Sequence, residues 1–177
     1  MRYLVTGAPG WLGTEFIKSL TGHNSSLIEL KNNLLIEEIR CLVHPKVSHQ
    51  NLLDINKNLK CIKGDLTIPK TIEDFFHDAE NSTLFHIAGI IHPKLFIKDI
   101  WDLNYVGTKN ILCAAIKNKV KRIIVVSSNS PVGVNESNSS LFDESSAYNP
   151  YMDYGKSKME MEMLVQESYN RGEIETV

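Results

Sequence analysis

The feature that most constrains this chain is a glycine-rich turn near its start. Arg2–Thr6 has the apolar, β-branched character of a strand, and Gly13–Leu20 continues with a helical pattern. The connection carries three regularly spaced glycines: Gly7, Gly10 and Gly13. In such a unit the first glycine permits a tight turn, the second lets a pyrophosphate approach the backbone, and the third allows close packing of the helix. The pattern predicts a dinucleotide site at the helix N-terminus.

The rest of the chain alternates short apolar runs with helical patterns. Further strands are expected at Ile39–Val43, Cys61–Lys63, Thr83–Ala88, Arg122–Ser127 and, as the start of a sixth, Glu173–Val177. Further helices are expected at Ile68–Glu80, Asp99–Lys117 and Met152–Tyr169. This alternation predicts an α/β fold with a doubly wound parallel sheet. The length favours one domain over residues 1–177.

Two segments do not fit this alternation. Residues 21–37 are longer than the usual connection of about 2–6 residues, and Leu27–Ile36 is compatible with either extra helical turns or an ordered insertion. Asn135–Ala147 is rich in serine and asparagine, which predicts a loop beside the site.

The composition argues against several classes of protein. A net charge of -2 without a basic cluster gives no reason to expect a nucleic-acid or membrane partner. No apolar stretch approaches the roughly 20 residues of a membrane span, and the start lacks the pattern of an export signal, so a cytoplasmic protein is expected. Cys41, Cys61 and Cys113 have neither CxxC nor zinc-ligand spacing, which predicts buried free thiols and no metal site.

A tyrosine and a lysine on the last predicted helix suggest acid/base chemistry. Tyr154 and Lys158 are four residues apart and therefore share one helix face. A free tyrosine, with a pKa of about 10, is a poor base, but a nearby ammonium group and an oxidised nicotinamide favour the phenolate. The same spacing also suits an amphipathic helix with an exposed lysine. Ser127 and Ser128 end the strand before it, at the sheet edge where ligands bind in such folds.

Together these motifs resemble those of the extended short-chain dehydrogenase/reductases, the family that contains the nucleotide-sugar epimerases. Its TGxxGxxG pattern is matched in full from Thr6 to Gly13. Its Ser-Ser-x-x-x-Tyr-Gly pattern is matched from Ser127, except that Val132 replaces the tyrosine. The resemblance implies a Rossmann fold and an NAD or NADP cofactor. It also implies catalytic roles for three residues: Ser128, which orients the substrate oxygen, Tyr154, the acid/base, and Lys158, which holds the nicotinamide ribose.

The resemblance also implies where the cofactor is contacted. Asp65 would accept a hydrogen bond from the adenine amine, and the small residues Ala88 and Gly89 would let the backbone lie against the cofactor. The implied cofactor-binding set is Gly7, Gly10, Trp11, Leu12, Gly13, His44, Asp65, Leu66, Ala88, Gly89, Tyr154 and Lys158. His86 is expected to be a partly buried histidine with satisfied hydrogen bonds and no catalytic role. Asn104 would fix local helix geometry or a proton-relay water.

Three features narrow the expected activity within that family. Asn129 and Ser130 stand where the 4,6-dehydratases carry an acid pair, which argues against a dehydratase. His44 follows the second strand where NAD-specific enzymes have a carboxylate, so NADP is favoured, as in reductase-like and hydroxysteroid-dehydrogenase-like members. Family members continue for nearly as long again after the position of Val177. The substrate domain is therefore expected to be absent from this chain, which would then show no turnover alone.

The expected function is hydride transfer at a hydroxyl or carbonyl carbon of a small molecule, namely a sugar nucleotide, a steroid-like compound or another alcohol or ketone. A nucleotide-sugar epimerase is the alternative within the family. A redox sensor that binds NAD(P) without turnover and an RNA-binding platform are alternatives from other classes. A homodimer is expected, because family members commonly pair through the helices that correspond to Asp99–Lys117 and Met152–Tyr169.

Overall fold

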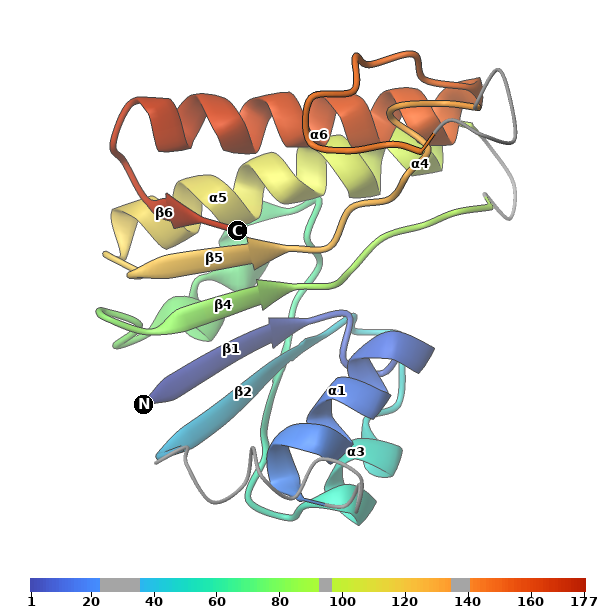
Figure 1. Cartoon of the computed structure of the whole chain (residues 1–177). Helices are drawn as coiled ribbons and strands as arrows, with labels where there is room; N and C mark the ends of the chain where they lie inside the picture. The colour runs from blue at the N-terminus through green and yellow to red at the C-terminus, as the bar shows by residue number, and fades with distance from the viewer. Residues whose placement is uncertain (23–35, 93–96, 135–140) are drawn as a thin grey trace.

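The computed structural model describes residues 1–22, 36–92, 97–134 and 141–177. Its centre is a six-stranded sheet in the order β3-β2-β1-β4-β5-β6, with every neighbouring pair parallel (Figure 1). The strands are β1 Arg2–Thr6, β2 Glu38–Val43, β3 Lys60–Lys63, β4 Thr83–His86, β5 Arg122–Val125 and β6 Glu175–Thr176. The order reverses at β1, which confirms the doubly wound sheet predicted from the sequence.

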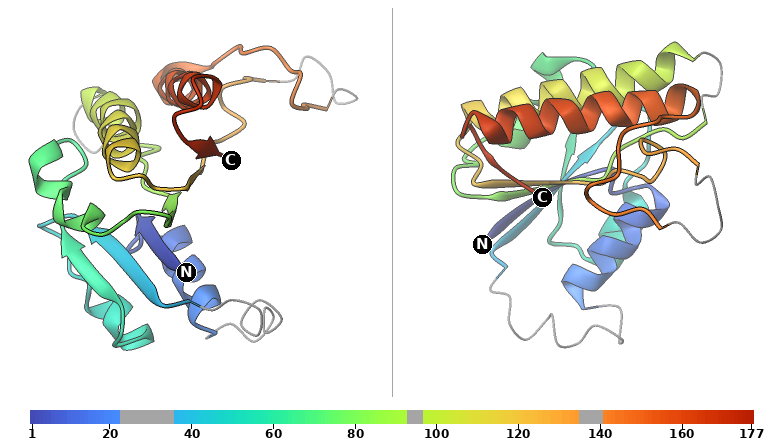
Figure 2. Two further views of the ribbon diagram at one scale, coloured as in Figure 1. Left: turned by 90° about the vertical axis from the view of Figure 1, so that its left-hand side faces the viewer. Right: turned by 45° about the horizontal axis from the view of Figure 1, so that its top comes forward.

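Helices cover both faces of the sheet. α1 (Trp11–Thr21) and α3 (Gln50–Ile55) lie on one face, while α5 (Thr108–Lys117) and α6 (Met152–Asn170) lie side by side on the other (Figure 2). The predicted helix at 99–117 is present in three continuous parts: α4 (Lys98–Trp101), the π-helical η4 (Asp102–Gly107) and α5. The short helix α3 was not expected from the sequence.

The core consists of two apolar layers, one on each face of the sheet. The layer towards α5 and α6 contains Leu4, Leu84 and Ile123 from the central strands. The layer towards α1 and α3 contains Val5 and Ile17. Because the central strands are covered on both faces, they carry the continuous apolar runs that distinguish buried parallel strands in the sequence.

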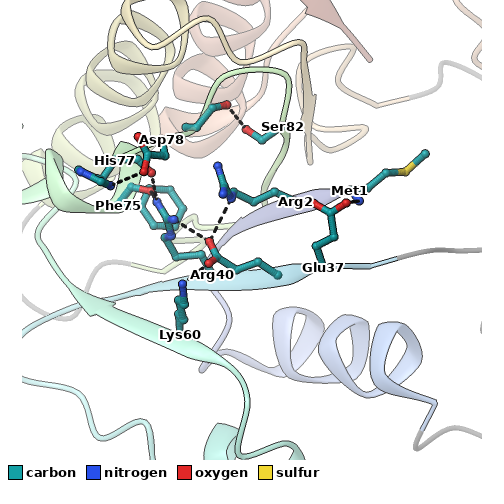
Figure 3. Close-up of polar contacts among 11 residues, drawn as sticks. Met1, Arg2, Glu37, Arg40, Lys60, Phe75, His77, Asp78 and Ser82 are labelled. Carbon is teal, nitrogen blue, oxygen red and sulfur yellow. Dashed lines mark hydrogen bonds and ion pairs between the residues drawn. The ribbon is translucent and has the colours of Figure 1, made fainter.

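The prediction of a helix at Ile68–Glu80 is wrong. The segment forms two short 3-10 helices, η2 (Pro69–Ile72) and η3 (Asp74–Phe76), and then turns at Asp78, whose φ is 51°. The Arg40 guanidinium donates hydrogen bonds to the carbonyl oxygens of Phe75 and His77, at 2.8 and 2.6 Å (Figure 3). A side chain from β2 therefore satisfies carbonyls that would otherwise bond within a continuous helix.

Arg40 belongs to a charge cluster at the N-terminal ends of the strands (Figure 3). Its guanidinium donates to the Glu38 carboxylate at 2.6 Å, and the same carboxylate pairs with Lys60 and, at 3.2 Å, with Arg2. Partial burial raises the pKa of Glu38, but the hydrogen bonds from Lys60 and Arg40 outweigh this effect and hold the pKa below its usual value. Glu38 therefore remains ionised at neutral pH.

The expectation of three buried thiols is correct only for Cys41. Cys61 is half-buried and Cys113 is exposed, although all three are free. Cys113 is exposed because α5 buries Ile111, Leu112 and Ala115, so that Cys113 lies on the opposite side of the helix. An apolar run in the sequence thus did not distinguish the two faces of this helix.

Residues 141–147 contain no helix or strand, in agreement with the predicted loop. The rest of that loop, residues 135–140, and most of the open segment at 21–37 lie outside the described residues. In the ranges that the structure covers, no helix is long and apolar enough to cross a membrane.

Candidate functional site

The glycine turn joins β1 to α1 at the carboxyl edge of the sheet. Gly7 has a φ of 75°, and a Cβ there would lie 2.6 Å from the backbone nitrogen of Ala88. A Cβ on Gly13 would lie 2.3 Å from the Gly7 carbonyl oxygen, so any side chain would separate the turn from the helix. Gly10 differs from both, because its Cβ would meet only that same oxygen, at 3.1 Å. Gly7 and Gly13 are thus required for close packing, whereas the space around Gly10 is open.

The N-terminus of α1 is left without a side-chain cap. Gly10 occupies the N-cap position, and the first turn contains no acidic residue. The backbone N–H groups there are available to an anion, which the helix dipole also favours. The side chains of Trp11 and Leu12 in this first turn are exposed, and the exposed fraction of Trp11 is 83%. Neither side chain is therefore part of the core.

His44 and Asp65 come together beyond the ends of β2 and β3. His44 Nε2 lies 3.4 Å from Asp65 Oδ2, and His44 Nδ1 accepts a hydrogen bond from the Lys46 backbone N–H. The other oxygen of Asp65 accepts from the backbone and hydroxyl of Thr67. Burial raises the pKa of Asp65, but these hydrogen bonds and His44 outweigh it and lower the pKa. Leu66 is buried next to this pair.

Two buried hydroxyl groups contact the His86 ring at the end of β4. His86 Nδ1 lies 2.7 Å from the Thr6 hydroxyl, and Nε2 lies 2.9 Å from the Thr108 hydroxyl. Burial, and then the nearby Lys158 ammonium, lower the pKa of His86 to about 3. Both ring nitrogens are satisfied and the ring is neutral, as predicted, but His86 is fully buried where partial burial was expected. Thr6 also accepts from the Ala88 backbone N–H, at 3.3 Å, so the glycine turn and the segment after β4 are connected.

Asn104 fixes the backbone after β4. Its side chain accepts from the Ile90 N–H at 2.8 Å and donates to the Ile90 carbonyl at 2.9 Å. It also donates to the hydroxyl of Ser157 in α6, at 3.1 Å. A Cβ on Gly89 would lie 3.4 Å from both the Asn104 side-chain oxygen and Lys158 Nζ. Glycine therefore lets the backbone approach Lys158 closely.

The first turn of α6 lies against the loop that follows β5. A Cβ on Gly155 would lie 2.7 Å from the Ser130 carbonyl oxygen. Gly133, with a φ of 84°, approaches Asn149 in the same way, and the Asn149 N–H donates to the Pro131 carbonyl at 2.9 Å. These contacts place the Ser128 loop next to the helix turn that carries Tyr154.

The two candidate serines have different environments. The Ser127 hydroxyl donates to the Glu162 carboxylate, whose second oxygen accepts from the Tyr148 hydroxyl at 2.9 Å. Ser128 lies 3.1 Å from the Ser130 hydroxyl and is half-buried at the surface of the loop. The Ser127 hydroxyl is thus bonded to a side chain of α6, whereas the Ser128 hydroxyl bonds to Asn129 and Ser130 of its own loop. Tyr148 was not predicted from the sequence, since its partner is 14 residues away across a loop.

Lys158 lies one helix turn after Tyr154 on α6, and its side chain is buried. Its ammonium donates to the Val126 carbonyl at 2.9 Å and contacts the Met161 sulfur at 3.7 Å. Burial lowers the pKa of Lys158 to about 8, although the Glu162 carboxylate acts in the opposite direction. The Tyr154 hydroxyl is half-buried and has no hydrogen-bond partner among the described residues.

The predicted residues thus form one continuous edge, from the His44–Asp65 pair through the glycine turn and Gly89 to Lys158. Within the described ranges, no cluster of His, Cys, Asp and Glu could hold a metal ion. The strand order and the glycine turn define a Rossmann fold. The family model of the NAD dependent epimerase/dehydratase family matches residues 3–177, and the chain belongs to this family.

Individual relatives and solved structures agree with this assignment. The chain is 39% identical over 160 residues to the uncharacterized protein y4nL of Sinorhizobium fredii, covering 90% of this chain and 43% of the relative. It is 28% identical over 173 residues to the N-acetyl-alpha-D-glucosaminyl-diphospho-ditrans,octacis-undecaprenol 4-epimerase of Escherichia coli, covering 97% and 45%. The dTDP-glucose 4,6-dehydratase DesIV of Streptomyces venezuelae, with NAD and TYD bound, has a TM-score of 0.84 at 22% identity, covering 99% and 54%. The chain therefore spans about half the length of the proteins it matches.

Proposed function

We propose that this chain binds NAD(P) along the carboxyl edge of its sheet and supplies the acid/base group for hydride transfer at a hydroxyl or carbonyl carbon. The observation that carries the proposal is the Lys158 ammonium, which is buried beside Gly89 with a single carbonyl acceptor. A buried ammonium with unused donors suits ribose hydroxyls. The N-terminus of α1 suits a pyrophosphate for the same kind of reason, since Gly10 supplies no side-chain cap to the backbone N–H groups of the first turn.

The proposed roles follow from the positions of three side chains. Tyr154 exchanges a proton with the substrate oxygen, and Ser128 donates a hydrogen bond that orients that oxygen. Lys158 orients the ribose and favours the ionised form of the tyrosine. Bound NAD(P) would supply the hydride donor or acceptor.

The substrate that we propose is a small molecule of the alcohol or ketone type, with sugar nucleotides as the first class to test. The relatives include a 4-epimerase, a D-erythronate dehydrogenase and dTDP-glucose 4,6-dehydratases. Asn129 and Ser130 cannot act as the acid pair of a dehydratase, which leaves simple reduction or oxidation as the main proposal and epimerisation as the alternative. Products of a panel of sugar nucleotides and ketones would separate the two.

We further propose that NADP is accepted at least as well as NAD. No carboxylate follows β2, and His44 is exposed where a 2′-phosphate would approach. Calorimetric titration of both cofactors at several pH values tests this proposal, and a strong NAD preference at every pH would refute it.

A homodimer through α5 and α6 is proposed on the basis of a groove on the surface of α6 beside η4. The groove has a volume of about 370 Å³ and is lined by Tyr105, Glu160, Met163, Leu164 and Glu167. Met163 is 50% exposed, which is unusual for a methionine on a helix that packs against a neighbour. Light scattering at micromolar concentration tests the pairing, and Met163→Glu should weaken it.

The cofactor site is tested by a substitution that leaves the fold intact. Gly10→Val adds a side chain where only the Gly7 carbonyl oxygen is near, so folding should be retained while cofactor affinity is lost. Calorimetry on the folded variant makes the measurement, and unchanged affinity would refute the assignment of the site.

The catalytic role is tested with Tyr154→Phe in a chain extended through the region that its relatives possess. We expect turnover to fall by about 10²–10⁴-fold with cofactor binding largely retained. Turnover near that of the wild type would refute the role of Tyr154. Tight cofactor binding without any turnover by the wild-type protein would instead favour a redox sensor.

A further inference from the structure

Two of the three thiols are neighbours in the sheet, on the two strands that lead to His44 and Asp65. Cys41 on β2 and Cys61 on β3 are direct partners in the parallel register. Both side chains belong to the apolar layer that faces α1 and α3. Neighbouring strands lie about 4.8 Å apart, which is within the range of about 4.4–6.8 Å that separates the Cα atoms of disulfide-bonded cysteines.

The two thiols differ in reactivity because their positions differ. Cys61 is half-buried on an edge strand, while Cys41 is fully buried on the strand inside it. The Cys41 thiol, and then the Lys63 ammonium, lower the pKa of Cys61 against the opposing effect of burial. The Cys61 thiol and burial raise the pKa of Cys41. An accessible thiol near a cation is the type that oxidants attack, and a buried thiol beside it can act as the second partner.

We propose that Cys61 reacts with peroxides and that Cys41 then forms a disulfide with it, linking β2 to β3. The Cys61 thiolate attacks one peroxide oxygen, the O–O bond breaks, and the departing hydroxide takes a proton to become water. The Cys41 sulfur then attacks the resulting sulfenic acid, which forms the S–S bond and releases a second water that contains the Cys41 proton. Two thiols and one peroxide thus give one disulfide and two waters, and the sulfurs lose two electrons in total.

The disulfide would act on the cofactor site through the ends of the two strands. Two residues after Cys41, β2 ends and leads into His44, and two residues after Cys61, β3 ends and leads into Gly64 and Asp65. A disulfide holds its Cβ atoms about 3.8 Å apart, closer than neighbouring strands normally lie. The edge strand β3 is paired on one side only and therefore moves more easily than β2. This expectation rests on the proposed NAD(P) function. Oxidation should shift Asp65 relative to His44 and thereby weaken cofactor binding. We expect a loss of affinity of at least about fivefold, which is the lower end of typical coupling between two sites.

The formation of the bond is tested by mass spectrometry of the whole chain after treatment with hydrogen peroxide. The wild type should lose the mass of two hydrogen atoms, recover it with dithiothreitol, and yield a cross-linked Cys41–Cys61 peptide after digestion. Cys113→Ser is the matched control, because it removes the exposed cysteine and should leave the reaction unchanged. Cys61→Ser and Cys41→Ala should both abolish the loss. Peptide mapping of the wild type decides the question even if a variant fails to fold.

The coupling is tested by calorimetry with NAD and NADP on the reduced and oxidised wild type. Peroxide-treated Cys61→Ser, which cannot form the bond, should bind like the untreated variant. Oxidation that stops at sulfinic acid on Cys61, or that joins two chains through Cys113, would overturn the proposed disulfide. Unchanged affinity in a chain shown to be cross-linked would overturn the coupling. If neither form binds a cofactor, the proposed function fails, while the mass spectrum still decides the disulfide.

Discussion

Arg40 and Lys158 are buried cations at opposite ends of the same sheet. Arg40, 5% exposed, donates to one carboxylate and two carbonyl oxygens near the N-terminal ends of the strands. Lys158, 4% exposed, donates to one carbonyl oxygen and contacts a sulfur near the carboxyl ends. A buried charge is stable when it is paired and its hydrogen bonds are made. Arg40 meets this condition through its carboxylate partner, whereas the partners that the structure describes for Lys158 are both uncharged.

The carboxylates near the two cations differ in the same way. Glu38 accepts hydrogen bonds from Lys60 and from Arg40, which together hold its pKa below the usual value against the effect of burial. Glu162 is occupied by Ser127 and Tyr148, and it only partly offsets the burial that lowers the pKa of Lys158 to about 8. The charge of Glu162 therefore does not fully compensate the burial of the Lys158 ammonium.

The same substitution at the two cations should have opposite effects on stability. Arg40→Met leaves the carbonyls of Phe75 and His77 without their donor and removes the buried partner of Glu38. We expect a loss of about 3–5 kcal/mol in the free energy of unfolding. Urea denaturation measures it, with Lys60→Met as the control, because Lys60 is an exposed partner of the same carboxylate and should matter by about 0–1 kcal/mol. Equal losses in both variants would contradict the distinction.

Lys158→Met should stabilise the chain. Met removes a buried ammonium whose pKa is depressed by burial, and we expect a gain of about 1–3 kcal/mol at pH 7 together with loss of cofactor binding. The penalty is fully present below pH 8, where both the folded and unfolded chains carry the proton. Between pH 8 and about 10.5 only the unfolded chain keeps it, so the wild type gains stability and the advantage of the variant shrinks.

The control for this measurement is Lys156→Met, which changes an exposed lysine on the same helix turn and should leave stability and its pH dependence unaltered. Thermal and urea unfolding at pH 7 and pH 10 give the comparison. A Lys158→Met chain less stable than the wild type at pH 7 would show that Lys158 is structural in the same sense as Arg40.

The features of the fold and the candidate site that could be predicted from the sequence are those that depend on local patterns. The glycine turn and the apolar runs predicted the positions of all six strands, because parallel strands buried on both faces are continuous in sequence. Tyr154 and Lys158 were predicted because a helix brings residues four apart onto one face.

The features that could not be predicted from the sequence depend on contacts between residues far apart in the chain. Arg40 bonds to Phe75 across 35 residues, and this contact, together with the left-handed turn at Asp78, replaces the predicted helix at 68–80 with short 3-10 turns. Ser127 meets Glu162 across 35 residues, and this partner was not predicted from the sequence. Hydrogen-bond partners of this kind leave no periodic signal in a single sequence.

His86 offers a third buried group, whose hydrogen bonds are satisfied by neutral hydroxyls and not by a charge. Its pKa of about 3 in the folded chain lies below the value of about 6.5 expected in the unfolded chain. Between these values the unfolded chain binds the extra proton, so stability is complete above about pH 6.5 and falls as the pH decreases. We expect a loss of about 1.4 kcal/mol per pH unit from this residue. Unfolding measured from pH 7 to pH 5 should show this slope in the wild type and not in His86→Gln, and equal slopes would contradict the assignment.

The smallest effect is expected at Tyr148, whose hydroxyl bonds to Glu162 at the edge of the site. Tyr148→Phe removes one of two donors to a carboxylate that retains Ser127, and the side chain is 46% exposed, so water can replace the lost hydrogen bond. We expect a loss of about 0.5–1 kcal/mol in the free energy of unfolding. Tyr151→Phe is the matched control, since Tyr151 is 61% exposed and its hydroxyl has no hydrogen-bond partner among the described residues. A loss above about 2 kcal/mol would mean that Glu162 holds this loop as firmly as Glu38 holds Arg40, and the two ends of the sheet would then differ less than their cations suggest.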